Sequence, residues 1–186
     1  MVLAIMLGGL FGLIFLGVPL GFTICFVSAG VLMFLADMPL WMFLQRFFAG
    51  LDSFVLVAIP FFLLTGNIMN QGNITERLIK FAYAIVGHIK GGLSLVMVIA
   101  CMLFGGVSGS AVADVAGVGS VMIPSMIKRG YSAQFAVALT STASTLGQII
   151  PPSIIMIVYA STAGTSVGAL FLAGVVPGFL IGLGLM

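Results

Sequence analysis

Charged residues are scarce in this sequence. Its 186 residues include six Lys or Arg and four Asp or Glu, so that 5% are charged and 62% are hydrophobic. A soluble domain carries roughly 25% charged residues, and so few charges cannot cover a water-exposed globule of this size. The composition therefore predicts an integral membrane protein rather than a soluble enzyme. The net charge of +2 is also too small for a nucleic-acid footprint, so we expect no nucleic-acid partner.

Histidine and cysteine are scarce as well. His88 is the only histidine and sits near Lys90 at the edge of an apolar run, whereas Cys25 and Cys101 lie far apart inside apolar runs. This pattern contains no metal-ligand spacing and no disulfide framework. A serine hydrolase of the membrane interior would need a general base near its serine, and His88 lies outside the serine-rich segments. We expect no catalytic residue and no enzyme.

Residues 1–36 carry no charge, and the first charged residue is Asp37. Because a cleavable signal peptide starts with a positive region, we expect this segment to stay in the protein as membrane structure. It is too long for one straight helix across a hydrocarbon core about 30 Å thick, and Pro19 interrupts it. Two short helices and one strongly kinked helix both fit this pattern.

The next segments alternate in polarity. Residues 37–53 carry an aromatic stripe that is typical of a helix lying in the membrane interface. Residues 54–70 are apolar and predict a short crossing, whereas residues 71–90 are the most polar part of the chain. We expect a surface helix in this polar part, with Asn73 or Thr75 as its N-cap.

A first break, GGVSGSAVAD at residues 105–114, interrupts the apolar stretch of residues 91–127. Irregular backbone at membrane depth is tolerated only where protein or a water-filled cavity satisfies it, which predicts a re-entrant hairpin with a tip between two half-length helices. Ser108 and Ser110 add hydroxyl oxygens there, and Asp114 shares a helix face with Ser110 and needs a partner. The alternative is close helix packing at the glycines, with Asp114 as a helix cap.

A second break, STASTLGQIIPPS, covers residues 141–153. Gly147 loosens the helix, and Pro151 and Pro152 have no backbone amide, so the carbonyl groups of residues 147–149 lose their usual partners. Free carbonyl groups in a discontinuous helix are a common place for a coupling ion. The alternative is a proline kink whose hydroxyl side chains bond their own backbone.

Together the two breaks predict one ion site. Hydroxyl and carbonyl oxygens suit Na⁺, whereas a proton relay would need several ionisable groups, and Asp114 is the only acid in the long apolar segments. We expect Na⁺, the coupling ion, to be held by Ser108, Ser110 and Gly147, with no other cofactor. The candidates for sodium or substrate binding are Ser108, Gly109, Ser110, Asp114, Ser144, Thr145, Gly147, Gln148, Pro151 and Pro152.

These motifs carry a family resemblance. The run FGGVSGSAVADVAGVGSVMIPSMIKRGYS, followed by ALTSTASTLGQIIPPSIIMIVYA, resembles the large membrane subunit of tripartite ATP-independent periplasmic (TRAP) transporters. The resemblance implies an ion-transporter-superfamily elevator fold of two inverted repeats, in the bacterial cytoplasmic (inner) membrane. It also implies two protein partners, a small four-helix membrane subunit and a periplasmic substrate-binding protein. The implied function is sodium-driven import of organic acids such as four-carbon dicarboxylates or sialic acid.

Members of that family are more than twice as long as this chain, so we expect an N-terminal half with the first repeat only. The expected fold is all-α and polytopic. Residues 1–90 would form scaffold-like membrane and interfacial helices, residues 91–160 the transport-like hairpin and broken helix, and residues 161–186 the start of a further membrane helix. The end of the chain inside an apolar run is typical of a fragment.

Charge asymmetry predicts an orientation. If residues 91–127 enter the membrane and return, the basic residues on either side of them share one face of the bilayer, opposite Arg46. An excess of basic residues marks the cytoplasmic side. The residues concerned are Arg77, Lys80, Lys90, Lys128 and Arg129.

Two other functions stay open on the sequence. One is a different anion carrier of the same superfamily, which would lack the two protein partners. The other is an ion channel formed by several copies of this chain, in which the hairpin of residues 91–127 would serve as a pore loop.

Overall fold

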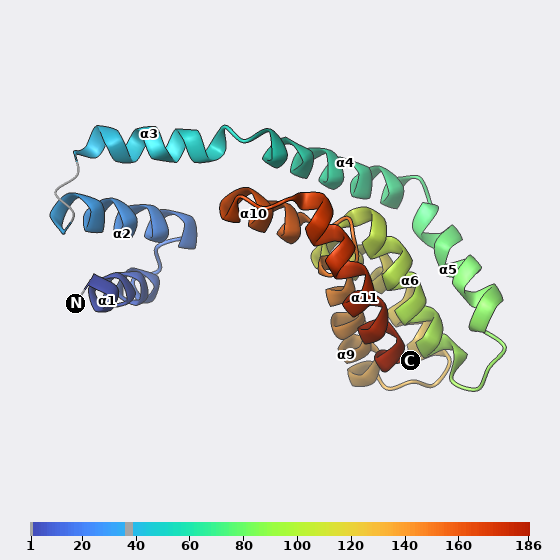
Figure 1. The fold of residues 1–186 in the computed structure, drawn as a ribbon. Helices are drawn as coiled ribbons and strands as arrows, with labels where there is room; N and C mark the ends of the chain where they lie inside the picture. The colour runs from blue at the N-terminus through green and yellow to red at the C-terminus, as the bar shows by residue number, and fades with distance from the viewer. Residues whose placement is uncertain (1, 36–38) are drawn as a thin grey trace. The chain divides into compact units, whose positions relative to one another are not determined.

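A computed structural model describes residues 2–35 and 39–186, and every regular element among them is helical (Figure 1). The chain divides into two compact units, Met1–Ser53 and Phe54–Met186. The all-α prediction is therefore confirmed for the described residues. The division into scaffold-like and transport-like segments concerns their roles and stays a prediction.

The first unit contains α1 (Val2–Phe15), α2 (Leu20–Phe34) and α3 (Leu40–Leu51). The chain turns between α1 and α2 at Gly17, whose φ of 80° lies in the left-handed region that favours glycine. Pro19 then stands immediately before α2. Two short helices, rather than one kinked helix, therefore make up the first apolar run. Asp37 lies outside the described residues.

The second unit begins with a 3₁₀ turn, Phe54–Val57, that leads into α4 (Ala58–Gln71). By length and composition this stretch can cross a membrane, as predicted for residues 54–70. The polar segment that follows forms α5 (Ile74–Val86), also as predicted.

The start of α5 has no side-chain cap. Asn73 occupies the N-cap position, but its φ of 57° is left-handed and its side chain makes no capping hydrogen bond. An N-cap residue normally has an extended backbone that aims its side chain at the amides of the first turn. Thr75 instead donates its hydroxyl to Asn70 Oδ1 at 2.8 Å. The expected capping by Asn73 or Thr75 is therefore wrong.

The core of the second unit is built around α6 (Gly92–Ser108). α5 and α9 (Ala133–Ser144) pack against it, and Phe104 is fully buried. Figure 1 shows α6 and α9, which pack side by side, and α11 (Val167–Leu185) packs against α6. Packing on several sides holds α6 in a regular helix through its glycine-rich end, so that the break is confined to the residues just after it.

The chain then reverses and returns through α7 (Ala111–Asp114), a π-helical turn (Val115–Gly119) and α8 (Ser120–Lys128). The π-helical turn lies against the end of α4, because a Cβ atom at Gly117 would be 2.5 Å from Asn70 Oδ1. The absence of a side chain at Gly117 therefore admits the Asn70 side chain.

The two arms of this hairpin are longer than predicted. α6 has 17 residues, and the helical run Ala111–Lys128 has 18. At 1.5 Å per residue each arm measures about 26 Å, against a hydrocarbon core of about 30 Å. The half-length helices expected from the sequence are therefore wrong, although the reversal itself is confirmed. The depth of the tip in the bilayer stays a prediction.

The second apolar stretch is broken at the two expected places. α9 continues into a 3₁₀ turn, Thr145–Gln148, and regular helix resumes only at α10 (Ile154–Ala163). Gly164, with a φ of 64°, ends α10, and the Ser166 hydroxyl accepts a hydrogen bond from the Ala169 amide at the start of α11. The helix is thus interrupted where the sequence predicted, and α11 follows residue 161; the role of α11 as a further membrane helix of the transporter stays a prediction.

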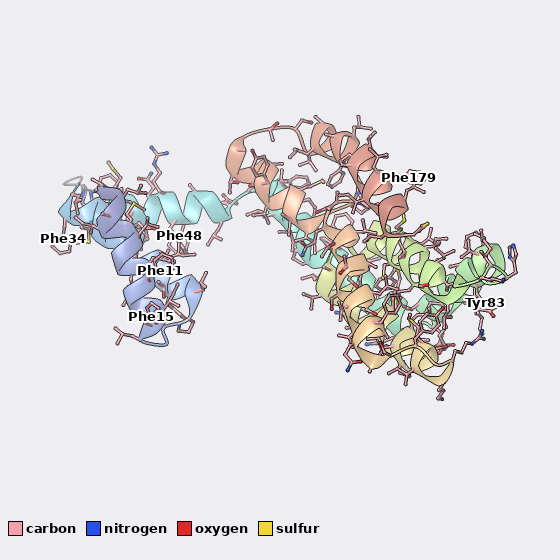
Figure 2. All side chains as sticks on the ribbon, turned by 90° about the horizontal axis from the view of Figure 1, so that it is seen from below. Phe11, Phe15, Phe34, Phe48, Tyr83 and Phe179 are labelled. Carbon is pink, nitrogen blue, oxygen red and sulfur yellow. The ribbon has the colours of Figure 1, made fainter. Side chains whose placement is uncertain are left out.

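The outer surface of the helices is apolar. Figure 2 shows Phe11, Phe15, Phe34, Phe48 and Phe179 projecting from the helices, and Phe15 is 88% and Phe34 82% exposed. Contact with water makes such surface unfavourable, whereas lipid tails solvate it. Together with the three helices of membrane-crossing length and composition found among the described residues, this surface makes the protein membrane-embedded. The location of α3 in the interface stays a prediction.

A row of buried glycines on α11 faces the second break and α6. Gly174, Gly178 and Gly182 follow one another at intervals of four residues and are all buried. A Cβ atom at Gly174 would lie 2.5 Å from Met156 Cε and 2.6 Å from the carbonyl oxygen of Ile149. This helix approaches its neighbours at the close distance that small residues permit.

We predict that Gly174→Ala destabilises the protein although alanine favours a helix. The added methyl group meets a backbone oxygen, and overpacking of this kind costs about 1–3 kcal/mol. Gly184→Ala on the same helix is the control, because nothing lies within 4 Å of its Cβ position. Thermal unfolding in detergent should show a lower midpoint for Gly174→Ala only. Equal midpoints for the two variants would contradict the close packing of α11.

Candidate functional site

The hairpin reverses within two residues. α6 ends at Ser108 because Gly109 adopts a left-handed φ of 63°, and the Gly109 amide donates to the Gly105 carbonyl oxygen at 2.9 Å. Ser110 is extended, and its hydroxyl accepts a hydrogen bond of 3.4 Å from the Ala113 amide, which starts α7. Ser110 is thus the N-cap of the second arm.

A short hydrogen bond crosses this reversal. The Ser108 hydroxyl donates to Asp114 Oδ1 at 2.6 Å, and both side chains are buried. The prediction that Asp114 and Ser110 share a helix face is wrong, because Ser110 is extended and lies outside the helix as its N-cap. The alternative that Asp114 is itself a cap is also wrong, since Ser110 has that role. Ser108 is the partner that a carboxylate at this position needs.

The second carboxylate oxygen of Asp114 lies between the two breaks. Among the described residues Oδ2 has no hydrogen-bond partner, and Asp114 is 0% exposed. A Cβ atom at Gly105 would lie 2.8 Å from this oxygen, and one at Gly147 would overlap it. Two glycines, one from each break, therefore form the niche for the carboxylate. Burial of an unpaired charge is costly, which favours a cation or a proton at this oxygen.

The two breaks also bond to each other directly. The amide of Ile154 donates to the carbonyl oxygen of Gly109 at 3.2 Å. A Cβ atom at Gly109 would lie 2.8 Å from the carbonyl oxygen of Pro152. Because a side chain at Gly109 would meet this backbone oxygen, glycine is required here for its small size as well as for its φ. The sequence prediction that the two breaks come together is confirmed by these contacts.

Not every carbonyl group of the second break is free. The Ser153 hydroxyl donates to the Gln148 carbonyl oxygen at 2.6 Å and accepts from the Met156 amide at 3.3 Å. Ser153 therefore satisfies one of the three carbonyl groups predicted to lack partners, and it also caps α10. Gln148, Pro151 and Pro152 are partly buried beside this contact.

The remaining candidate hydroxyls divide into two groups. Ser144 is buried, with its Oγ 3.8 Å from the sulfur of Cys101. Thr145 is exposed and donates to the carbonyl oxygen of Thr142 at 2.7 Å. For Thr145 the back-bonding alternative is therefore confirmed, whereas Ser144 points into the core beside α6. Binding of sodium or substrate by any of these candidates stays a prediction.

Sequence reasoning missed two residues of this site. Ser153 follows two prolines and precedes an apolar run, which is a recognisable start signal of a helix. Gly105 was considered only as half of a packing pair with Gly109, but its close neighbour is Gly147 in the other break. A contact between residues so far apart in the chain leaves no local signal.

The basic segments meet at the other end of the hairpin. Arg129 Nη1 donates to the Tyr83 hydroxyl at 3.0 Å, and the guanidinium carbon lies 5.3 Å from the Tyr83 ring centroid. This contact brings the end of α8 beside α5, so the two basic segments share one end of the hairpin, as predicted. The assignment of that end to the cytoplasm stays a prediction.

We predict that Gly109→Ala destabilises the protein more than Gly164→Ala does. The two glycines have nearly equal φ values of 63° and 64°, so alanine suffers the same backbone strain, about 1–2 kcal/mol. Nothing lies within 4 Å of the Cβ position at Gly164, whereas Gly109 faces Pro152. The midpoint of thermal unfolding in detergent should fall further for Gly109→Ala. A larger fall for Gly164→Ala would argue against contact between the breaks.

Comparison with known proteins agrees with this architecture. Residues 7–186 match the family described as the tripartite ATP-independent periplasmic transporter, DctM component. The chain is 43% identical over 184 residues to the sialic acid TRAP transporter large permease protein SiaM of Vibrio cholerae, an alignment that covers 97% of this chain and 43% of SiaM.

Two further relatives are named as permeases for other substrates. The C4-dicarboxylate TRAP transporter large permease protein DctM of Pseudomonas aeruginosa is 53% identical over 141 residues, covering 76% of this chain and 33% of that protein. The ectoine TRAP transporter large permease protein TeaC of Halomonas elongata is 41% identical over 179 residues, covering 95% and 42%. This chain thus spans between 33% and 43% of the length of these relatives. The chain belongs to the DctM family of TRAP transporter large permease components, which are transporters rather than enzymes.

Proposed function

We propose that this chain forms the first repeat of the permease in a sodium-coupled secondary transporter that imports organic acids. In this proposal it works by an elevator mechanism in the bacterial inner membrane. Its partners are a small four-helix membrane subunit and a periplasmic binding protein that delivers the substrate. The observation that carries the proposal is the meeting of the two helix breaks around the buried carboxylate of Asp114.

The oxygen groups around Asp114 support sodium as the coupling ion. The Ser108 hydroxyl donates a hydrogen bond to Asp114 and accepts one from the Ser110 amide at 3.3 Å, so its oxygen acts as an acceptor at the tip. Gly147 brings the backbone of the second break against the same carboxylate. Hydroxyl, carbonyl and carboxylate oxygens at a broken helix are the ligands by which such carriers hold Na⁺. A cation there would also neutralise the unpaired Oδ2 oxygen.

The names of the relatives support the substrate class. Two of them are described as permeases for sialic acid and for C4-dicarboxylates, both of which carry carboxylate groups. We therefore propose a small organic acid as the cargo of the assembled permease.

Transport by a chimaera tests this function. Residues 7–186 would replace the aligned segment of the sialic acid permease of Vibrio cholerae, and the chimaera would be reconstituted in proteoliposomes with the other components of that transporter. We expect sialic acid uptake that is lost when choline replaces sodium. The double variant Ser108→Ala and Ser110→Ala should need about tenfold more sodium for half-maximal uptake, which corresponds to about 1.4 kcal/mol of lost binding.

Ser120→Ala is the matched control, because its hydroxyl bonds only the Gly117 carbonyl oxygen of its own helix. This control should leave the sodium response unchanged, and the parent permease shows that the assay works. Uptake that persists equally in choline would rule out sodium coupling. An unchanged sodium response in the double serine variant would rule out the proposed ligands.

Asp114→Asn separates an ion site from a structural contact. The amide oxygen of asparagine still accepts the Ser108 hydroxyl, but the negative charge is gone. We expect the purified chain to melt at a higher temperature in sodium chloride than in choline chloride, because a bound ion stabilises the folded state. The variant should stay folded and lose this difference. Aggregation of Asp114→Asn in both salts would instead indicate a purely structural role.

A further inference from the structure

A second polar feature lies at the basic end of the hairpin, away from the two breaks. A pocket of about 260 Å³ opens where α5, α6 and α8 meet. Its floor is apolar and includes Leu93 and Met122, which are 7% and 1% exposed. Its rim is polar and carries the side chains of Lys80, Arg129 and Tyr83. The pocket therefore combines two positive charges with a hydrophobic base.

The Arg129 side chain is held in place at this rim. One of its guanidinium nitrogens donates to the Tyr83 hydroxyl at 3.0 Å, and the guanidinium lies over the Tyr83 ring at 5.3 Å. Arginine has five N–H donors in a planar fork, so the remaining donors stay available to an anion. Because the fork is already ordered, binding an anion costs little further entropy.

The pocket also carries an excess of positive charge. Among the described residues, its lining includes Lys80 and Arg129 but no acid. Glu76, one turn before Lys80, instead lines a neighbouring cavity with Asn70 and Ser120. The rim therefore offers two cations to a ligand from outside the chain.

We propose that this pocket binds the headgroup of an anionic phospholipid. Lys80 and Arg129 contact the phosphate, Ser125 offers a hydroxyl, and the apolar wall receives the start of an acyl chain. An amphiphile matches a charged rim above a hydrophobic floor, whereas a free phosphate ion would leave the floor unused. Basic pockets between membrane helices are suited to anionic lipid headgroups. The inference depends on membrane embedding and not on sodium coupling or on the transported substrate.

Titration of the detergent-purified chain with short-chain lipids tests this site. Dioctanoyl phosphatidylglycerol is compared with dioctanoyl phosphatidylcholine and with inorganic phosphate. One basic residue near an anionic headgroup contributes about fivefold in affinity, so we expect the anionic lipid to bind about 25-fold more tightly than the zwitterionic one. Lys80→Gln and Arg129→Gln should each lower this preference about fivefold.

Matched variants separate a specific pocket from general charge attraction. Lys90→Gln removes a basic residue that does not line the pocket and should leave the preference intact. Tyr83→Phe keeps the ring but removes the hydroxyl that orients Arg129, so it should weaken binding less than Arg129→Gln. Because Lys80→Gln and Tyr83→Phe alter different side chains, they keep the test decisive if Arg129→Gln fails to fold.

Three outcomes would overturn the proposal. The first is equal affinity for the two lipids. The second is an equal loss of affinity in Lys90→Gln and Lys80→Gln, which would indicate unspecific attraction. The third is full displacement of the anionic lipid by inorganic phosphate at the same concentration, which would indicate a site for a phosphate ion only.

Discussion

The Asp114 carboxylate imposes the constraint on which the second unit depends. This group is fully buried, and only one of its oxygens is satisfied, by the Ser108 hydroxyl. The other oxygen fills the space where side chains at Gly105 and Gly147 would lie. The end of α6, the hairpin reversal and the broken helix after α9 must therefore lie close together for the carboxylate to fit. Each of these segments contains irregular backbone that would be unstable alone in a membrane. The contact between them stabilises both breaks.

Serine side chains perform much of this local stabilisation. Ser110, Ser153 and Ser166 each accept an amide hydrogen bond at the start of a helix, as do the capping residues of water-soluble proteins. In lipid the same bond has greater consequence, because no water is present to satisfy an exposed amide. The two breaks are thus irregular in shape, but in the part of the chain that the structure describes their buried side-chain polar atoms are almost all paired. The Oδ2 oxygen of Asp114 is the exception among the described buried side-chain atoms.

The sequence predicted the places where helices are interrupted better than the contacts between them. Glycine and proline act on the backbone locally, so the turn at Gly17 and the break before Ile154 could be foreseen. The bond between Ser108 and Asp114 could not, because a separation of six residues is not a helical spacing and arises only from the reversal at Gly109. The niche formed by Gly105 and Gly147 depends on tertiary packing. The arms were predicted too short because the glycines of α6 looked like helix breakers, whereas burial keeps that end helical.

The π-helical turn at Val115–Gly119 has a consequence for how the second arm is aimed. Such a turn contains one residue more than an α-helical turn, so it rotates everything beyond it about the helix axis by roughly a hundred degrees. On an unbroken α-helix Met122 and Met126 would point roughly 80° and 120° away from Asp114 around the axis, whereas with the inserted residue all three buried side chains fall within about 20° of one direction. One buried face thus continues from the carboxylate to the methionines, and a single inserted residue keeps it in register along the second arm.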